Sequence, residues 1–246
     1  MKPSISLQLW SVKEDCERDF LHTLTQVKAY GYDAVEFAGY HGVPAETLRA
    51  HLDSIGLGIT GSHISFEQLT DRFEETLAFE KTLGNRRIIV PYLTAATMAE
   101  WHKYFRQLSR LSGRLAQEGC QLGYHNHAHE LTETGQDVLD AMTKEVAGLT
   151  LEVDTYWLAY AGVPVVPWLT AHRSVIRELH LKDMLAENRE STELGKGCLP
   201  LEDYVAFARE NDIRHLVVEQ EAFQQLTPME SARMNAKVLK QLVGND

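Results

Sequence analysis

Short apolar runs alternate along the chain with longer segments in which apolar residues recur at helical spacing. Runs of about four to eight apolar residues predict buried strands, and apolar residues three or four positions apart predict amphipathic helices. The predicted strands are residues 4–10, 34–37, 58–63, 87–91, 121–125, 150–154, 176–181 and 215–219. The predicted helices are residues 20–30, 45–55, 66–83, 95–118, 135–146, 166–171, 201–211 and 228–243. Gly31, Gly56 and Gly84 follow three of these helices directly, as helix-ending glycines do.

Strands that alternate with helices in this rhythm, over about 250 residues, predict an α/β fold of the (β/α)8 TIM barrel type. A doubly wound open sheet is the alternative, and it normally carries a glycine-rich loop after its first strand. Here that place is taken by residues 11–15, which contain no glycine. Because no linker or Pro-, Gly- or Ser-rich tract divides the chain, we expect one barrel domain over residues 1–246.

Composition narrows the range of partners. The 246 residues include 35 acidic and 24 basic side chains, a formal net charge of −11. A nucleic-acid phosphate backbone would be repelled by such a chain, so we expect no nucleic-acid partner and favour a small neutral or metal-bridged substrate. Cys16, Cys120 and Cys198 are widely separated and odd in number, which predicts reduced thiols rather than a disulfide framework. With no signal segment or membrane-spanning apolar run, we expect a cytoplasmic protein with no membrane contact, as a monomer or a homo-oligomer.

The carboxyl ends of barrel strands meet at one mouth, so the residues there are the candidates for chemistry. Three imidazoles and a carboxylate follow the fifth predicted strand, within residues 123–130. Several ionisable groups at one strand end indicate a shared ligand, either a metal or a polar substrate. The candidates at the eight strand ends are Gln8, Trp10, Glu36, His63, Tyr92, His125, Asn126, His127, Asp154, Trp157, His180, Lys182, Asp183, Glu219 and Glu221.

Three of these predict a metal site. Asp154 closes a strand that is apolar on both sides, where a carboxylate is costly unless a positive charge neutralises it. His180 alternates with apolar residues and should point into the mouth, and Glu219 ends the eighth strand with Glu221 behind it. Oxygen and imidazole ligands without a thiolate suit Mn²⁺, Zn²⁺, Fe²⁺, Co²⁺ or Mg²⁺.

Other candidates also have a purely structural interpretation. His63 is either a substrate contact or an ordinary surface histidine, and Glu36 either a proton carrier or a salt-bridge partner at the rim. Asp183 is either catalytic or a cap of the following loop. We expect His129 to be peripheral, and His215, which begins its strand, to be structural.

Six segments carry a resemblance to a known family: GYDAVE (31–36), GYHNH (123–127), VDTYW (153–157), HLKD (180–183), GKG (195–197) and VEQE (218–221). With them, nearly the whole chain resembles the sugar phosphate isomerase/epimerase family. These xylose-isomerase-like barrels also include inosose dehydratases, hydroxypyruvate isomerases and ketose 3-epimerases. The resemblance implies a metal held by an acidic residue of strand five, an Asp of strand six, a His of strand seven and a Glu of strand eight. The last three correspond to Asp154, His180 and Glu219.

The chain departs from the family at strand five, where many relatives have Glu-Asn-His and this sequence has His125, Asn126 and His127. In the epimerases, the glutamates of strands five and eight are a pair of bases on opposite faces of the substrate. A histidine in place of one of them removes one negative charge and weakens the expectation of a two-carboxylate epimerase. It also suits β-elimination of water or of a glycosidic leaving group next to a ketone.

The expected reaction is therefore a metal-dependent isomerisation or epimerisation of a keto-sugar, sugar phosphate or keto-cyclitol through an enediolate. The metal would be bound by Asp154, His180 and Glu219, with His125 as a fourth ligand. The expected proton carriers are Glu219, His127, Glu36 and Glu221, and Lys182 would neutralise an oxyanion or hold a hydroxyl or phosphate. The expected substrate contacts are Gln8, Trp10, His63, Tyr92, Trp157, Lys182 and Glu221.

Three other functions stay open at this point. The first is a metal-dependent lyase or dehydratase acting on a keto-sugar or inosose. The second is a non-catalytic metabolite-binding barrel, which would hold no metal although its ligands are present. The third is an endonuclease of apurinic sites, a related class of metal barrel, against which the acidic balance of the chain speaks.

Overall fold

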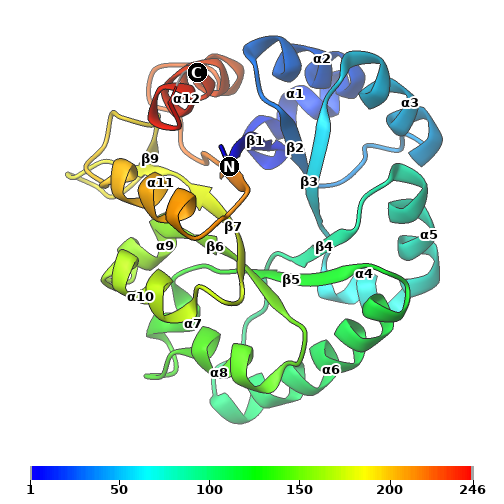
Figure 1. The fold of residues 1–246 in the computed structure, drawn as a ribbon, viewed down its shortest axis with the longest axis vertical. Helices are drawn as coiled ribbons and strands as arrows, with labels where there is room; N and C mark the ends of the chain where they lie inside the picture. The colour runs from blue at the N-terminus through cyan, green and yellow to red at the C-terminus, as the bar shows by residue number, and fades with distance from the viewer. Residues whose placement is uncertain (1, 245–246) are drawn as a thin grey trace.

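The computed structural model describes residues 2–244, and its central feature is a closed barrel of eight parallel strands (Figure 1). The strands follow one another around the barrel in chain order, and the last pairs with the first. They are β1 Ser4–Gln8, β2 Ala34–Phe37, β3 Gly58–His63, β4 Arg87–Val90, β5 Gln121–His125, β6 Thr150–Asp154, β7 Ile176–Leu181 and β10 His215–Val218. The predicted (β/α)8 TIM barrel is confirmed.

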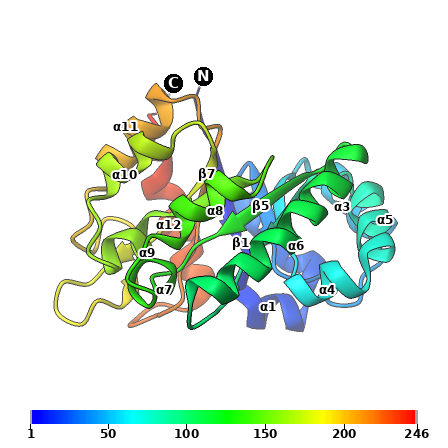
Figure 2. The ribbon, with the colours of Figure 1, turned by 90° about the horizontal axis from the view of Figure 1, so that it is seen from below.

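The larger helices form a ring outside the strands (Figure 1). They are α2 Phe20–Tyr30, α3 Ala45–Ile55, α5 Phe73–Leu83, α6 Met98–Gln117, α8 Val138–Glu145, α10 Val165–His172, α11 Leu201–Glu210 and α12 Pro228–Leu242. Shorter elements follow the strands: η1 Leu9–Val12, α1 Lys13–Arg18, α4 Phe66–Asp71, α7 His129–Thr132, α9 Thr155–Tyr160 and the hairpin of β8 Asp183–Met184 with β9 Ser191–Thr192. In the side view, α1, α4 and α7 lie at the end of the barrel away from the N-terminus (Figure 2).

Local chemistry explains where elements begin and end. The predicted first strand ends two residues early, because the Gln8 side chain accepts a hydrogen bond from the Trp10 amide and starts η1. The predicted helix over residues 66–83 is broken at Arg72, whose backbone is not helical (φ −129°). Helices α6 and α12 begin with capping boxes, formed by Thr97 with Glu100 and by Thr227 with Glu230.

The inside of the barrel carries charge where many such barrels carry branched apolar side chains. In β6, Leu151 and Val153 belong to the apolar core, whereas the alternate residues Glu152 and Asp154 are buried among polar groups. At the level of Glu152, Arg87 Nη1 lies 2.9 Å from Glu178 Oε1. Burial raises the pKa of Glu178 well above its usual value, and the nearby Arg87 opposes this shift.

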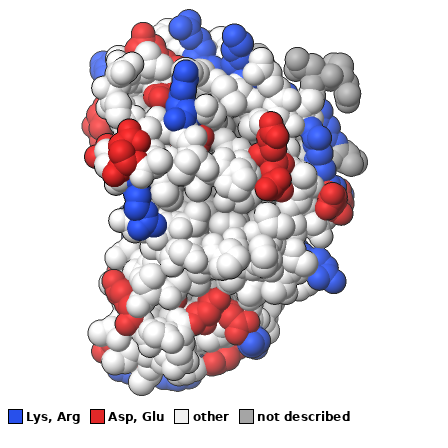
Figure 3. All heavy atoms as spheres, turned by 90° about the vertical axis from the view of Figure 1, so that its left-hand side faces the viewer, with Lys and Arg blue, Asp and Glu red and all other residues white. Residues whose placement is uncertain are grey.

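The outer surface is mixed in charge. On the face over α9 to α12, acidic and basic side chains of the described residues are scattered among uncharged ones, without a continuous basic patch (Figure 3). Among residues 2–244, no helix has both the length and the apolar character that a membrane span requires.

Candidate active site

Four side chains from neighbouring strands meet at the carboxyl end of the barrel, and we call them the upper cluster: His125, Asp154, His180 and Glu219. Each offers one atom, and these atoms all lie within 4.8 Å of one another. His125 Nε2 is 3.4 Å from Asp154 Oδ2 and 3.8 Å from Glu219 Oε2. His180 Nδ1 is 3.0 Å from Glu219 Oε2. All four residues are buried, so a charged ligand here would be largely shielded from water.

Both ring nitrogens of His125 are buried in the upper cluster without a hydrogen-bond partner among the described residues, and Asp154 Oδ2 makes no hydrogen bond there but lies 3.0 Å from the Lys182 ammonium. Buried polar groups are almost always paired, so a group of unpaired ones in one place calls for a ligand. Two imidazoles and two carboxylates at this spacing match the donor set of a divalent ion such as Zn²⁺ or Mn²⁺. The residues present therefore fit a metal ion.

Neighbouring groups hold Asp154 in place. Its Oδ1 accepts hydrogen bonds from the amides of Tyr156 (2.9 Å) and Trp157 (3.1 Å), so Asp154 caps helix α9. Asn126 binds the Asp154 backbone twice, through Oδ1 to N at 2.9 Å and through Nδ2 to O at 3.3 Å. Because Oδ1 is occupied by the helix cap, Oδ2 is left for the upper cluster.

Lys182 supplies positive charge to the same carboxylates. Its buried Nζ lies 3.0 Å from Asp154 Oδ2, 2.9 Å from Glu219 Oε2 and 2.5 Å from Glu221 Oε1. Burial alone would lower the pKa of Lys182, but Asp154, Glu219 and Glu221 raise it well above its usual value. Burial alone would raise the pKa values of Asp154 and Glu219. The charge of Lys182 is the largest of the effects that oppose burial, and the net result is that both pKa values are lowered. Both carboxylates are thus anionic, as metal ligands must be.

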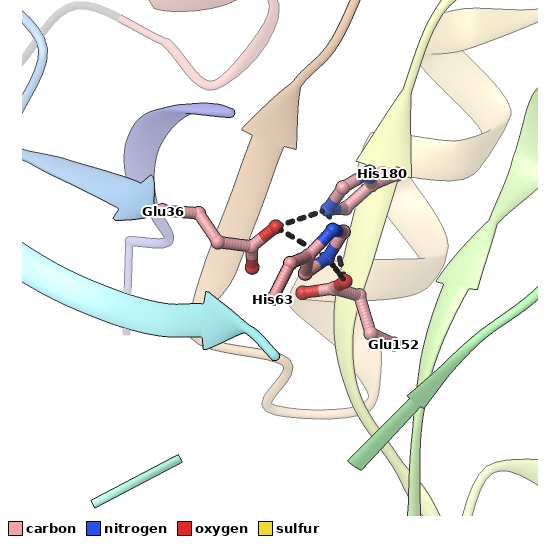
Figure 4. Close-up of side chains that lie close together, drawn as sticks. All are labelled: Glu36, His63, Glu152 and His180. Atoms are coloured by element: carbon pink, nitrogen blue, oxygen red, sulfur yellow. Dashed lines mark hydrogen bonds and ion pairs between the residues drawn. The ribbon is translucent and has the colours of Figure 1, made fainter. Parts of the chain in front are cut away.

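A second group, which we call the lower cluster, consists of Glu36, His63, Glu152 and the same His180 (Figure 4). His180 Nε2 lies 3.0 Å from Glu36 Oε1 and 3.2 Å from Glu152 Oε2. His63 Nε2 lies 2.9 Å and 2.7 Å from the same two oxygens. Burial lowers the pKa of His63, yet Glu36 and Glu152 outweigh it and raise the value to about 10. His180 joins the two clusters, with Nδ1 in the upper and Nε2 in the lower.

A cavity of about 570 Å³ lies against the upper cluster. It is lined by Trp10, Ala38, Gly39, His63, Ser65, Gln68, Pro91, Tyr92, His125, His127, Glu219 and Glu221. Trp10 and Tyr92 are 48% and 51% exposed, so two large rings offer apolar faces to whatever fills the cavity. This is the size and character expected for a small-molecule site.

His127 lines this cavity as a neutral ring. Burial lowers its pKa to about 2, and the positive charges of His125 and Lys182 add to the effect. Its backbone amide donates to Glu130 Oε2 at 2.9 Å, and its Nδ1 has no partner among the described residues. The ring lies beside Tyr92 and Trp157, with centroids 5.3 and 5.4 Å away. His127 is therefore placed to accept a hydrogen bond from a bound molecule, while its lowered pKa speaks against the predicted role as a proton carrier.

The predicted residues separate into two levels. Trp10, His63, Tyr92, His127, Glu219 and Glu221 line the cavity. Gln8 and Glu36 lie deeper and are fully buried, with Gln8 Nε2 donating to Glu36 Oε1 at 2.5 Å. Since the Gln8 amide also accepts from Trp10 N, both ends of that group are occupied inside the protein. This burial speaks against the predicted role of Gln8 as a substrate contact and of Glu36 as a direct proton carrier.

The remaining predicted positions have structural surroundings. Asp183 caps the following loop, as one of its two interpretations expected: its carboxylate accepts from the amides of Met184, Gly195, Gly197 and Leu199. His129 Nε2 contacts the Leu93 carbonyl at 2.7 Å, and His215 Nδ1 contacts Ser4 Oγ at 2.6 Å. Trp157 is partly buried beside His127, with Lys182 Nζ 5.3 Å from its ring centroid.

Sequence reasoning missed Glu152, which completes the lower cluster. It stands two positions before Asp154 in a single strand, and residues two apart face the same side. Because Asp154 was expected to face the barrel interior, the same alternation predicts that Glu152 faces it too. The sequence pattern therefore contained the signal for Glu152.

Comparisons with known proteins identify the surrounding family. The sequence profile described as xylose isomerase-like TIM barrel matches residues 24–242. The rhizopine catabolism protein MocC of Rhizobium meliloti is 25% identical over 185 residues, which are 65% of this chain and 56% of MocC. The inosose dehydratase of Geobacillus thermodenitrificans is 24% identical over 196 residues, 70% of this chain and 65% of the dehydratase. The chain thus spans less than two thirds of the length of these two relatives.

Solved structures show the same fold. A sugar phosphate isomerase/epimerase from Parabacteroides distasonis superposes with a TM-score of 0.83 at 24% identity, covering 96% of both chains. The IolI protein with a bound zinc atom superposes with a TM-score of 0.80 at 14% identity, covering 98% of both chains. At these identities the likeness is one of architecture.

Proposed function

Since the chain belongs to the xylose isomerase-like TIM barrel family, we propose that it is a metal-dependent enzyme that isomerises or epimerises a keto-sugar, sugar phosphate or keto-cyclitol. The shared step is removal of a proton from the carbon next to a carbonyl. One observation carries the proposal: the upper cluster, in which neither ring nitrogen of His125 has a hydrogen-bond partner among the described residues, lies directly against a cavity of about 570 Å³.

The ligands would be His125, Asp154, His180 and Glu219. When bound, a divalent ion would polarise the substrate carbonyl and stabilise the enediolate. The IolI protein is described with a bound zinc atom. This supports zinc among the ions that the donor set allows.

The protein's own groups then divide the work. Glu219, anionic and at the cavity wall, removes the proton from the carbon next to the carbonyl. Lys182, charged and buried, stabilises negative charge on the neighbouring oxygen. His127, neutral in this environment, accepts a hydrogen bond from a substrate hydroxyl. Trp10 and Tyr92 cover the apolar faces of the ring and exclude water from it.

One observation favours a second candidate, the β-elimination of water or of a glycosidic leaving group. Within the upper cluster, Glu219 is the carboxylate that lines the cavity, while strand five contributes the imidazole of His125. A single carboxylate base is sufficient for elimination, whereas epimerisation needs a second proton carrier on the opposite face. The 24% identical inosose dehydratases support this candidate.

The two candidates can be separated by nuclear magnetic resonance in deuterium oxide. Zinc- or manganese-loaded protein would be incubated with ketohexoses, ketopentoses, their phosphates and inososes. Isomerisation or epimerisation predicts a new isomer labelled at the carbon next to the carbonyl, and elimination predicts a dehydrated product or a released aglycone. A metal-loaded protein that exchanges no such proton and eliminates nothing would contradict both.

A further inference from the structure

The lower cluster is bonded in a definite pattern. His180 Nε2 donates to Glu36 Oε1 at 3.0 Å, and His63 Nε2 donates to Glu152 Oε2 at 2.7 Å (Figure 4). The remaining contacts, His63 to Glu36 at 2.9 Å and His180 to Glu152 at 3.2 Å, cross between the pairs. Nε2 of each ring thus faces two carboxylates, one from strand β2 and one from strand β6.

The direction of these bonds follows from chemistry. An ionised carboxylate only accepts hydrogen bonds, so the ring nitrogen that faces it carries the proton. Nε2 of His180 is therefore protonated, and its other nitrogen, Nδ1, lies in the upper cluster 3.0 Å from Glu219 Oε2. A metal ion bound there would displace any proton that Nδ1 shares with Glu219, and a histidine whose proton is held on Nε2 then presents the Nδ1 lone pair to the ion.

We propose that Glu36 and Glu152 are positioning residues for the metal site: they hold His180 with its proton on Nε2, aim Nδ1 at the cation and strengthen its binding. The inference rests on the proposed function and assigns a role to two carboxylates beneath the ligand set. Carboxylates that accept from the free nitrogen of a metal-binding histidine make that histidine a stronger donor. Only the His180 ring separates the two negative charges from the cation. The buried surroundings screen the attraction between them less than water would.

His63 makes this arrangement stable. Two carboxylates buried side by side would repel each other, and His63 Nε2 lies between them, 2.9 Å from Glu36 Oε1 and 2.7 Å from Glu152 Oε2. Gln8, which pairs in register with Glu36, adds a hydrogen bond to Glu36 Oε1.

The lower cluster could itself be taken for a metal site, since its four atoms also lie within 4.8 Å of one another. Its nitrogen atoms, however, are already hydrogen-bonded to carboxylates, while those of His125 have no partner among the described residues. The geometry therefore favours a proton-linked support below and a cation above.

The test compares zinc affinity in near-isosteric variants. Glu36→Gln and Glu152→Gln keep size and an acceptor oxygen but remove the charge. Each should weaken zinc binding about 10- to 100-fold in calorimetric or competition titrations. Glu80→Gln is the matched control. Glu80 is a buried carboxyl outside both clusters, and it accepts hydrogen bonds from Ser62 at 3.0 Å and Asn85 at 2.8 Å. The Glu80→Gln variant should therefore bind zinc with the affinity of the wild type.

A spectroscopic measurement separates positioning from a general loss of structure. In ¹⁵N-labelled, zinc-loaded protein, the Nε2 proton of His180 should be observed in slow exchange and far downfield, and it should move upfield in both glutamine variants but not in Glu80→Gln. Because Glu36 and Glu152 come from different strands, either variant alone carries the test if the other fails to fold.

Three outcomes would overturn the inference. Wild-type zinc affinity with an unshifted His180 signal in both variants would show that the carboxylates do not act on the ligand. Two zinc ions per chain, the second lost in Glu152→Gln, would make Nε2 a ligand rather than a donor. A wild-type protein that takes up no zinc or manganese would refute the proposed metal site together with this inference, whereas the first two outcomes leave the proposed function standing.

Discussion

The upper and lower clusters contain the same kinds of groups, two carboxylates and two imidazoles, and share His180. They differ in how their atoms are partnered. In the lower cluster Nε2 of His63 and Nε2 of His180 donate to carboxylates at 2.7 and 3.0 Å, whereas in the upper cluster neither ring nitrogen of His125 has a hydrogen-bond partner among the described residues. Composition and spacing alone therefore do not distinguish the two clusters. The feature that favours a metal ion in the upper cluster is a ring with unpaired nitrogens beside a cavity.

The clusters also balance charge by different means. In the lower cluster, the imidazole of His63 provides positive charge to Glu36 and Glu152. Above, the ammonium of Lys182 contacts Asp154 and Glu219, and a metal ion would add two further positive charges. Each of the four predictions that follow changes one residue that belongs to one of the clusters or contacts it.

The largest effect is expected from Asp154→Ala, which removes a ligand of the upper cluster alone. Metal binding should be abolished, with affinity reduced at least about 100-fold, because a buried anion is lost from the ligand set. Asp154 also caps α9, so the melting temperature should fall by a few degrees while the barrel stays folded. Elemental analysis and circular dichroism would check both. Stoichiometric metal in the folded variant would contradict the assignment of the upper cluster.

Lys182→Met should lower the turnover of the metal-loaded enzyme about 10²- to 10³-fold, the usual effect of losing one group that stabilises an oxyanion. It should also tighten metal binding, because Lys182 contacts the same two carboxylate oxygens that a metal would use. The control is Lys144→Met, an exposed lysine paired with Asp140 on the surface. Unchanged turnover together with unchanged affinity would remove Lys182 from the mechanism.

His125→Glu restores the acidic residue of strand five found in many relatives. With three carboxylates in the upper cluster, the metal-free protein should become less stable, since the added charge is buried beside the carboxylates of Asp154 and Glu219. The metal-loaded protein should bind zinc about tenfold more tightly through the extra anionic ligand. Melting curves with and without zinc would show the two opposite shifts. Equal shifts in variant and wild type would mean that His125 is not a ligand.

The smallest effect concerns the lower cluster and pH. The pKa of His63 rises from 6.5 to about 10, so the folded state binds a proton more tightly than the unfolded chain. Its contribution to stability is complete below pH 6.5 and is lost as the pH rises towards about 10, by at most about 1.4 kcal/mol per pH unit. Urea unfolding of metal-free protein should show the advantage of wild type over His63→Gln shrinking across that range. A constant difference would mean that His63 is not charged.

Much of the fold could be predicted from the sequence because strands and helices differ in their apolar period. The ranges predicted for β2, β3, β5, β6 and β7 and for α2 and α3 agree with the structure. The errors lie after the strands, where α1, α7 and α9 are helices of at most six residues. Segments that short carry too little periodicity to be recognised, and caps such as the Asp154 carboxylate decide them.

The candidate site was predictable only in part. Asp154, His180, Glu219 and His125 follow from strand ends that share one mouth, and the structure brings them together. The depth of each side chain is not in the sequence pattern, because it depends on how strands are staggered around the barrel. Strand β6 shifts register against β7 between Leu151 and Glu152, and strand β2 shifts against β3 between Val35 and Glu36. Such shifts put Glu36 and Glu152 on one level beneath the mouth.

His180 has a consequence for how this barrel can change its chemistry. Since one ring serves both clusters, no single substitution at this position alters the metal site while leaving the support beneath it intact. Asp154, Glu219 and His125, by contrast, can be exchanged one at a time. Directed evolution of the protein should therefore accumulate new specificities around a histidine that does not vary, with innovation confined to its neighbours.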